Sequence, residues 1–289
     1  MPKGRAKEII NKTTMKKFLT RAGLGLATIA VVVAGAAAFS AFEAHVINVT
    51  AKIENALTVP VEPIRFGTVF PQEQLDGFLP VSLSQSFQDE RNADDVNYII
   101  RQKPKCGVVH EDTGVVVPSW TGHVIPNIEG AGYTVDCEKE RPITVPSNPN
   151  DPEFYLLPSL CPYLSKHEMT DDLVGPQGPQ PDNDGSLAAF HQPFEVVNGL
   201  VVWNDVKGRL AKSEQDTADT WKIDLKVPCF GGYCAQDWEK YVLDINPGAV
   251  ASDYVQDIEN EHKVFGCNLW VEVTGVSRST TPLPIPGPQ

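Results

Sequence analysis

The sequence predicts an all-β fold: a jelly-roll-like antiparallel β-sandwich with a long proline-rich insertion and one or two short helices, preceded by an N-terminal signal or transmembrane helix. Residues 220–227 and 268–276 alternate apolar and polar side chains with the period of two that is typical of half-buried strands. Many other short segments lie between prolines and glycines, of which the chain has 24 and 22. Such punctuation is typical of sandwiches and jelly rolls.

Residues 1–38 have the pattern of an export signal, with a basic start followed by an uncharged run over residues 22–42. Ala36 and Ala38 supply the small side chains that signal peptidase requires, and Phe39 would then begin the mature chain. Ala38 followed by Ser40 offers a second choice of small side chains. The run is also long enough for a membrane anchor, which takes about 20 residues, so a retained anchor is the alternative. The basic flank places the body outside the membrane in both cases.

The body that follows the leader is strongly acidic. Of the 24 basic residues seven precede residue 39, whereas only one of the 37 acidic residues does, so the remaining 17 basic and 36 acidic residues give a formal net charge of −19. Phosphate binding needs a clustered cationic face, so this charge argues against nucleic acid as a partner. Composition near the globular norm predicts a folded domain over residues 39–276.

Further strands are expected along this domain, each a short run rich in β-branched and aromatic residues. In chain order they are residues 45–53, 64–70, 81–87, 96–102, 108–117 and 187–194.

Three segments depart from the strand pattern. Residues 140–186 are rich in proline, asparagine and aspartate and predict a long surface insertion, with one or two helical turns near residues 154–164. Residues 235–244 place Trp238, Tyr241 and Val242 at helical spacing, which predicts a short helix on a sheet face. Residues 277–289 carry prolines at alternate positions from Pro282 and predict an extended tail.

The body contains six cysteines, an even number that indicates disulfides in an oxidising compartment. Fifteen pairings are possible and the sequence leaves the choice open, although two glycines in residues 229–234 favour a local bridge between Cys229 and Cys234. The cysteines are Cys106, Cys137, Cys161, Cys229, Cys234 and Cys267.

No motif predicts a catalytic centre, a cofactor or a metal site. His167 and Glu168 resemble the start of a zinc-protease helix, but Asp171 stands where the second histidine belongs. Residues 182–185 resemble a fragment of a calcium loop without its remaining ligands. The pairs at residues 94–95 and 171–172 could serve a secreted hydrolase only by facing each other across a cleft, an alternative that stays open.

Residues 26–57 resemble the start of the camelysin/TasA family of exported, fibre-forming surface and biofilm-matrix proteins. The match consists of a Gly/Ala-rich span, the small residues Ala36-Ala37-Ala38 before Phe39, a polar spacer and then a β-strand at residues 45–57. Ala41 stands where the family often has an acidic residue. The resemblance implies a jelly-roll body and assembly by donor-strand complementation, in which the first strand of one subunit inserts into the sheet of the next.

The sequence therefore predicts a non-enzymatic, exported surface or matrix protein that self-associates, with no nucleic-acid partner and a membrane contact only through its leader. A strand near a free N-terminus can leave its own domain and pair with an exposed edge. The residues expected to form this donor strand are Val46, Ile47, Val49, Ala51 and Ile53.

A carbohydrate- or ligand-binding module is the alternative function. Trp120, Trp203 and Trp270 are the candidates for an exposed aromatic platform, unless they belong to the core.

Overall fold

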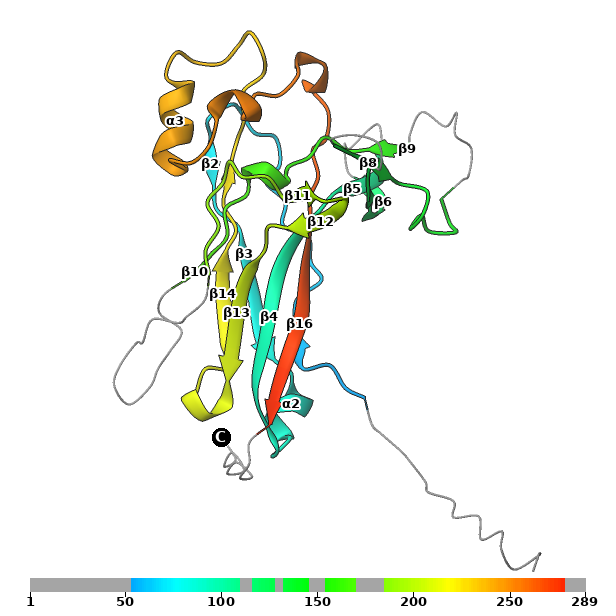
Figure 1. Cartoon of the computed structure of the whole chain (residues 1–289), viewed down its shortest axis with the longest axis vertical. Helices are drawn as coiled ribbons and strands as arrows, with labels where there is room; N and C mark the ends of the chain where they lie inside the picture. Colours follow the sequence, from blue (N-terminus) through cyan, green and yellow to red (C-terminus); the bar gives the residue numbers. More distant parts are fainter. Residues whose placement is uncertain (1–52, 110–115, 128–131, 146–153, 170–184, 279–289) are drawn as a thin grey trace, which may run out of the picture. The chain divides into compact units, whose positions relative to one another are not determined.

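The computed structural model describes residues 53–109, 116–127, 132–145, 154–169 and 185–278 (Figure 1). The predicted signal cleavage site, the donor strand up to Ala51 and the proline-rich tail lie outside the described residues. None of the helices within the described ranges is long and apolar enough to cross a membrane.

Antiparallel sheets make up most of the described chain, which confirms the all-β prediction. One main sheet has the order β1 (Leu57–Thr58), β3 (Phe78–Leu83), β14 (Ala218–Lys222), β10 (His167–Glu168). The other has the order β13 (Val206–Ala211), β4 (Ala93–Lys103), β16 (Asn268–Arg278). The smaller sheets are β11 (Phe194–Val197) with β12 (Leu200–Trp203); β15 (Leu225–Lys226) with β2 (Gln74–Leu75); β5 (Lys105–Val109) between β6 (Val116–Thr121) and β9 (Phe154–Leu156); and β7 (His123–Pro126) with β8 (Tyr133–Asp136).

The helices are short. They are α2 (Gln85–Asp89), α3 (Trp238–Ile245) and the 3-10 turns η1 (Cys161–Tyr163), η2 (Lys212–Glu214), η3 (Ala251–Tyr254) and η4 (Ile258–Asn260). The helix α3 lies where the spacing of Trp238, Tyr241 and Val242 predicts it, and its buried residues Trp238 and Val242 join the core.

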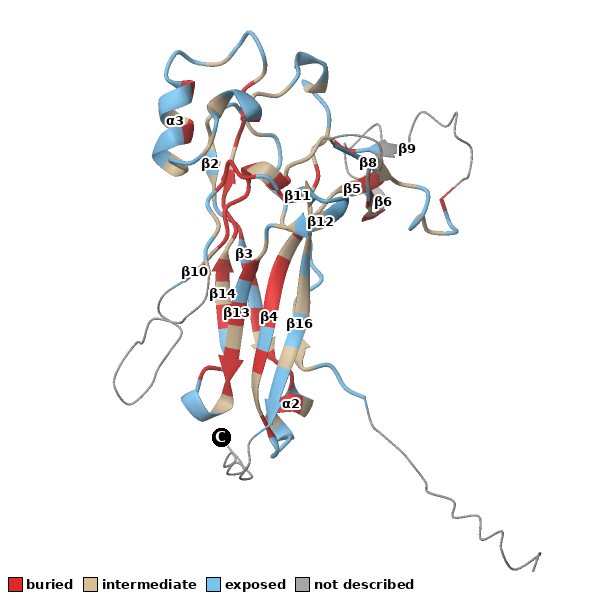
Figure 2. Ribbon diagram, viewed as in Figure 1, coloured by how far each residue is buried: buried red, intermediate tan, exposed pale blue. Residues whose placement is uncertain are grey.

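The two main sheets share one hydrophobic core (Figure 2). Alternate residues of β4, among them Tyr98, are fully buried and pack with residues of β3 and β14. The Tyr98 hydroxyl donates to the carboxylate of buried Asp219 and accepts a hydrogen bond from the Trp221 indole at 2.6 Å. A Cβ atom at Gly208, on the neighbouring β13, would lie 2.2 Å from the Tyr98 ring, so glycine leaves the space that the ring fills.

Both ends of the described chain leave the body near α2. Ser84 caps this helix by accepting a hydrogen bond from the Phe87 amide, and its hydroxyl donates to the Asn55 carbonyl at 2.6 Å. At the other terminus, Arg278 pairs with Ala93, the first residue of β4. The opposite end of β4, at Lys103, pairs with Asn268 at the start of β16.

Two of the predicted strands are wrong. Residues 64–70 form no strand because Gly67 has a φ of 75° and prolines flank the segment, although Ile64 and Phe66 still pack on the core. Residues 187–193 are likewise irregular: Phe190 has a φ of 61°, and its amide donates to the Pro162 carbonyl.

Three other predicted strands have different bounds. The one at residues 81–87 stops at Leu83, because Ser84 starts α2. The one at residues 108–117 divides between β5 and β6, and the one at residues 220–227 divides between β14 and β15.

The expectation of a surface insertion at residues 140–186 is wrong for residues 154–169, whereas residues 140–144 are exposed or half-buried. Leu157, Tyr163 and Leu164 are buried, and β9 and β10 pair with strands of the body. The Ser165 amide donates to the Asp224 carbonyl, and Lys166 exchanges backbone hydrogen bonds with Leu187. This segment is therefore an integral part of the core.

Three disulfides join the six cysteines. One is the local pair Cys229–Cys234, which the sequence favoured. Cys106–Cys137 closes a small second core with Trp120 and Val145. Cys161–Cys267 links the segment before β10 to the start of β16 across 106 residues. This number of disulfides is typical of proteins in an oxidising, extracellular environment.

The Cys161–Cys267 disulfide should contribute more stability than the local one. In the chain-entropy model, closing a loop of this length contributes about 5 kcal/mol, against about 2 kcal/mol for a loop of five residues. We expect the free energy of unfolding in urea to fall by these amounts in the Cys161→Ala/Cys267→Ala and Cys229→Ala/Cys234→Ala variants. Equal losses in the two double variants would contradict this account.

Candidate functional site

Within the described ranges, β16 is the last strand of its sheet. It pairs with β4 along its whole length, with register shifts after Val273 and Val276. Among the described residues, no backbone hydrogen bond joins β16 to any other strand. A strand of eleven residues that is unpaired along one side is a template on which another strand can add.

Apolar side chains of β16 reach solvent along this edge. Val273 and Val276 stand opposite Tyr98 and Val96 of β4, whose side chains are fully buried. Yet Val273 is 45% exposed and Val276 is 47% exposed. The core-facing side of β16 is therefore incompletely covered, and in Figure 2 the strand is largely intermediate or exposed beside a mostly buried β4. We call β16 with Val273 and Val276 the open edge.

The expected donor strand lies almost wholly outside the described residues. Only its last member, Ile53, is described, and this residue is 92% exposed. The strand that follows it, β1, is two residues long and pairs with the end of β3. The structure therefore does not describe the predicted donor strand, apart from Ile53.

The three candidate tryptophans do not form one platform. Trp120 is buried beside Cys106, and its indole donates to the Cys137 carbonyl at 2.7 Å. Trp203 and Trp270 flank the Lys103 ammonium, which lies 5.8 Å and 3.3 Å from their ring centroids.

Neighbouring charges hold this cluster in place. Glu272 pairs with Arg101 and Lys103 at 3.1 Å and 3.4 Å, and Asp205 pairs with Arg101 at 3.1 Å. Because a protein cation already contacts each of the two rings, the arrangement favours a structural role over a sugar platform.

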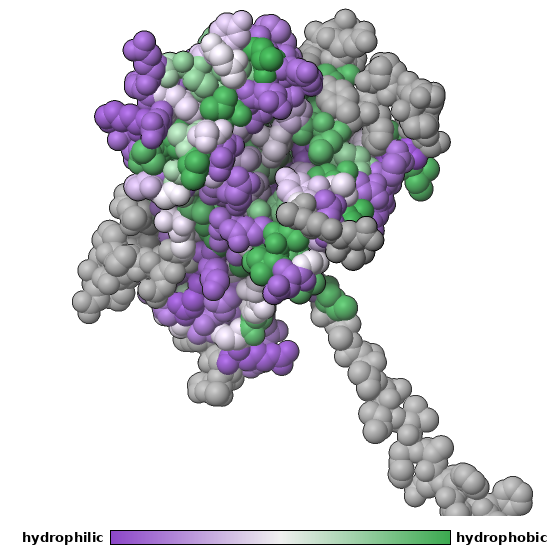
Figure 3. All heavy atoms as spheres, turned by 45° about the horizontal axis from the view of Figure 1, so that its top comes forward, coloured by the Kyte–Doolittle hydropathy of each residue, from purple (hydrophilic) through white to green (hydrophobic). Residues whose placement is uncertain are grey.

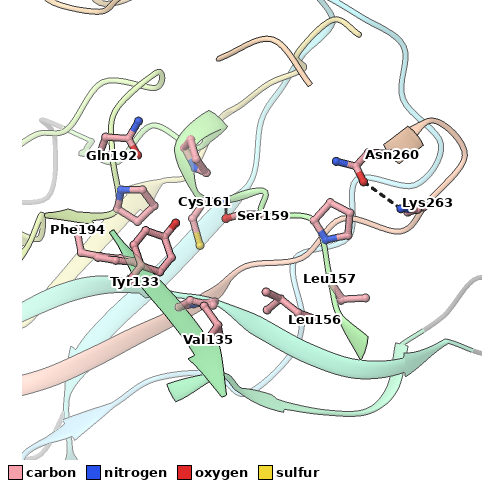
Figure 4. Close-up of a pocket in the computed structure, with 14 residues that line it drawn as sticks. Tyr133, Val135, Leu156, Leu157, Ser159, Cys161, Gln192, Phe194, Asn260 and Lys263 are labelled. Carbon is pink, nitrogen blue, oxygen red and sulfur yellow. Dashed lines mark hydrogen bonds between the residues drawn. The ribbon is translucent and has the colours of Figure 1, made fainter. Parts of the chain in front are cut away.

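A second surface feature is an apolar groove of about 620 Å³ (Figure 4). Its lining residue Pro104 follows the end of β4 that lies away from α2. Tyr133 and Phe194 lie on one side with ring centroids 4.6 Å apart, and Asn260 and Lys263 lie on the other. Leucines and prolines complete the wall, namely Leu156, Leu157, Pro104, Pro158, Pro162 and Pro193. In Figure 3, which turns this end forward, hydrophobic residues reach the surface in several patches.

The buried lysine cluster consists of Lys166, Gln102 and His191, which lie together in the interior. Lys166 and Gln102 have no exposed surface, and His191 has almost none. The network is satisfied when the Gln102 amide oxygen accepts from Lys166 at 2.8 Å and its nitrogen donates to the His191 Nε2 at 2.8 Å. The Nδ1–H of His191 then donates to the Ala188 carbonyl at 2.7 Å. Burial lowers the pKa of Lys166 to about 7, while burial and the Lys166 charge lower the pKa of His191 to about 3.

Sequence reasoning missed this cluster. Lysine is rarely buried, and the alternation around Lys166 gave no strand signal. Of the motif residues weighed for metal, His167 and Glu168 lie on β10, and Asp171 is outside the described residues.

The described acidic pair at residues 94–95 contacts neighbouring groups of the body. Asp94 accepts a hydrogen bond from the Ser213 amide, and Asp95 pairs with Arg209 at 3.2 Å. Within the described ranges, no group of three His, Cys, Asp or Glu side chains is arranged to hold a metal ion. The pair at residues 171–172 lies outside those ranges.

Comparisons with known proteins give no relative: no family model, no curated protein and no solved structure matches the chain. The open edge, the groove and the buried lysine cluster must therefore be interpreted from their own chemistry.

The buried lysine should make stability depend on pH. Between pH 7 and 10.5 the unfolded chain binds a proton at Lys166 that the folded chain does not, so stability rises with pH across this window. Relative to the Lys166→Met variant, we expect the wild-type free energy of unfolding to increase by on the order of 4 kcal/mol over this range. Urea unfolding at pH 7, 8.5 and 10 measures the difference. Parallel pH profiles for the two proteins would contradict the assigned burial.

Proposed function

We propose that this chain is an exported, non-enzymatic structural protein of the cell surface or extracellular matrix, which assembles into filaments by donor-strand complementation. The residues around Val46–Ile53 of one copy would add as a strand to the open edge of the next. The proposal includes a jelly-roll topology for the body and cleavage of the leader before Phe39.

The open edge is the observation that carries this proposal. An added strand would supply hydrogen-bond partners to the free side of β16 and would cover Val273 and Val276, which stand over the core. The donor segment matches these needs, because Ile47, Val49, Ala51 and Ile53 alternate with Asn48, Thr50 and Lys52. One face of the added strand would therefore be apolar and the other polar.

The geometry of such a contact favours an open assembly. The donor precedes β1 in the chain, and the acceptor is β16, so the two contact surfaces of one copy are different. A heterologous contact of this kind produces filaments unless its rotation closes a ring. The resemblance of residues 26–57 to the camelysin/TasA family supports the same mode of assembly.

Changing the open edge should block assembly while leaving the domain folded. In the Val276→Asp variant an unpaired carboxylate would be buried by the donor strand, so we expect self-association to be roughly a hundredfold weaker. Because the Val276 side chain is half-exposed in a single copy, the free energy of unfolding should change by about 1 kcal/mol or less. Negative-stain microscopy and sedimentation of the exported chain measure the assembly.

Two controls separate this effect from general damage. Val250→Asp places the same charge at an exposed valine in the loop after α3, where assembly should continue as in wild type. Deletion of residues 39–53 removes the proposed donor strand and should abolish elongated particles. A wild-type chain that stays monomeric at high concentration would contradict the proposal.

A further inference from the structure

We propose that the apolar groove binds the proline-rich segment of a second copy, residues 279–289. This inference rests on the proposed assembly, which brings a second copy to the groove, but it adds a contact that donor-strand exchange does not require. It assigns an occupant to a surface that the first proposal leaves empty.

The groove has the chemistry that an extended proline-rich peptide needs. Tyr133 is 51% exposed and packs edge-to-face with Phe194, so the two rings form one apolar side of the groove. Proline-rich segments dock in such aromatic-lined grooves because their polyproline conformation costs little further ordering entropy on binding. The volume of about 620 Å³ lies in the usual range for binding pockets, about 300–1,000 Å³.

Polar groups on the rim suit the same occupant. Polyproline segments have no internal hydrogen bonds, so their carbonyl groups accept from donors on the partner. Gln192, Asn260 and Lys263 line the groove and carry such donors, and Lys263 lies 3.1 Å from the Asn260 side-chain oxygen. Residues 279–289 contain four prolines, with Leu283 and Ile285 between them, and no charged side chain. Their composition therefore matches both the apolar wall and the rim.

Distance argues that the segment comes from another copy. The segment follows Arg278, which pairs with Ala93 at the α2 end of β4. The groove includes Pro104, which follows Lys103 at the other end. The ten steps from Arg278 to Asn268 along β16 span about 34 Å. Eleven residues of polyproline helix also span about 34 Å, so only the last residue of 279–289 would reach the start of β16, and the segment could not lie along the groove of its own copy.

The polarity of the body agrees with this assignment. The proline-rich segment follows Arg278, which pairs with Ala93 at the α2 end of β4, whereas Pro104 of the groove follows the opposite end of β4. Copies arranged end to end would bring the two surfaces together. The contact is heterologous and would reinforce an open chain of subunits.

A labelled synthetic peptide with the sequence of residues 279–289 tests the proposal by fluorescence anisotropy. The receptor is the exported full chain with Pro282, Pro284, Pro286 and Pro288 replaced by alanine, so that no receptor segment competes. We expect saturable binding that weakens about tenfold in the added Tyr133→Ser variant. The matched control is Tyr233→Ser, which changes an exposed tyrosine in the loop closed by Cys229 and Cys234. This variant should bind the peptide with the affinity of the unaltered receptor.

Absence of saturable binding, or equal affinity of the Tyr133→Ser and Tyr233→Ser variants, overturns the groove as the site. If the dilute wild-type chain resists the peptide while the alanine-substituted receptor binds it, the occupant is the chain's own segment, and the second-copy assignment is wrong. Peptide binding is measured without filaments, so its failure is distinct from the failure of donor-strand assembly, which the deletion of residues 39–53 reports.

Discussion

The packing of β4 against β14 is the interaction on which the rest of the structure depends. Tyr98, Asp219 and Trp221 form a hydrogen-bonded group in the interior, and their rings and neighbours join the two main sheets in one core. Buried polar groups of this kind are stabilising only when every member has a hydrogen-bond partner. Because Tyr98 finds its partners on β14, the group fixes how the two sheets are aligned. Gly208 on β13 belongs to the same arrangement, because any side chain there would displace the Tyr98 ring.

This central packing also explains the open edge. With β4 fixed in the middle of its sheet, β13 covers one side and β16 the other, and β16 has no described strand beyond it. The inner side of β16 stays partly uncovered at Val273 and Val276. The Cys161–Cys267 disulfide ties the residue before β16 to the segment before β10.

Much of the fold follows from local sequence pattern, whereas the candidate site does not. The alternation of Trp221 and Ile223 with charged residues, and that of Leu269 and Val271 with polar ones, identified strands whose apolar face packs on the core. The same alternation is found in central and edge strands, so it could not show that β16 is open. Burial of Lys166 and the integration of residues 154–169 depend on partners distant in the chain, such as Gln102 and Cys267. Residues 64–70 have strand-like composition, but Gly67 turns the chain there.

Hydrogen exchange of β16 tests the central claim most directly. In an edge strand about half of the amides face away from the neighbouring strand and exchange with solvent. The account predicts that these amides in Asn268–Arg278 exchange rapidly in the chain lacking residues 39–53 and become protected when the intact exported chain assembles. Equal exchange of β16 in the two states, with assembly intact, would contradict donor-strand addition at this edge.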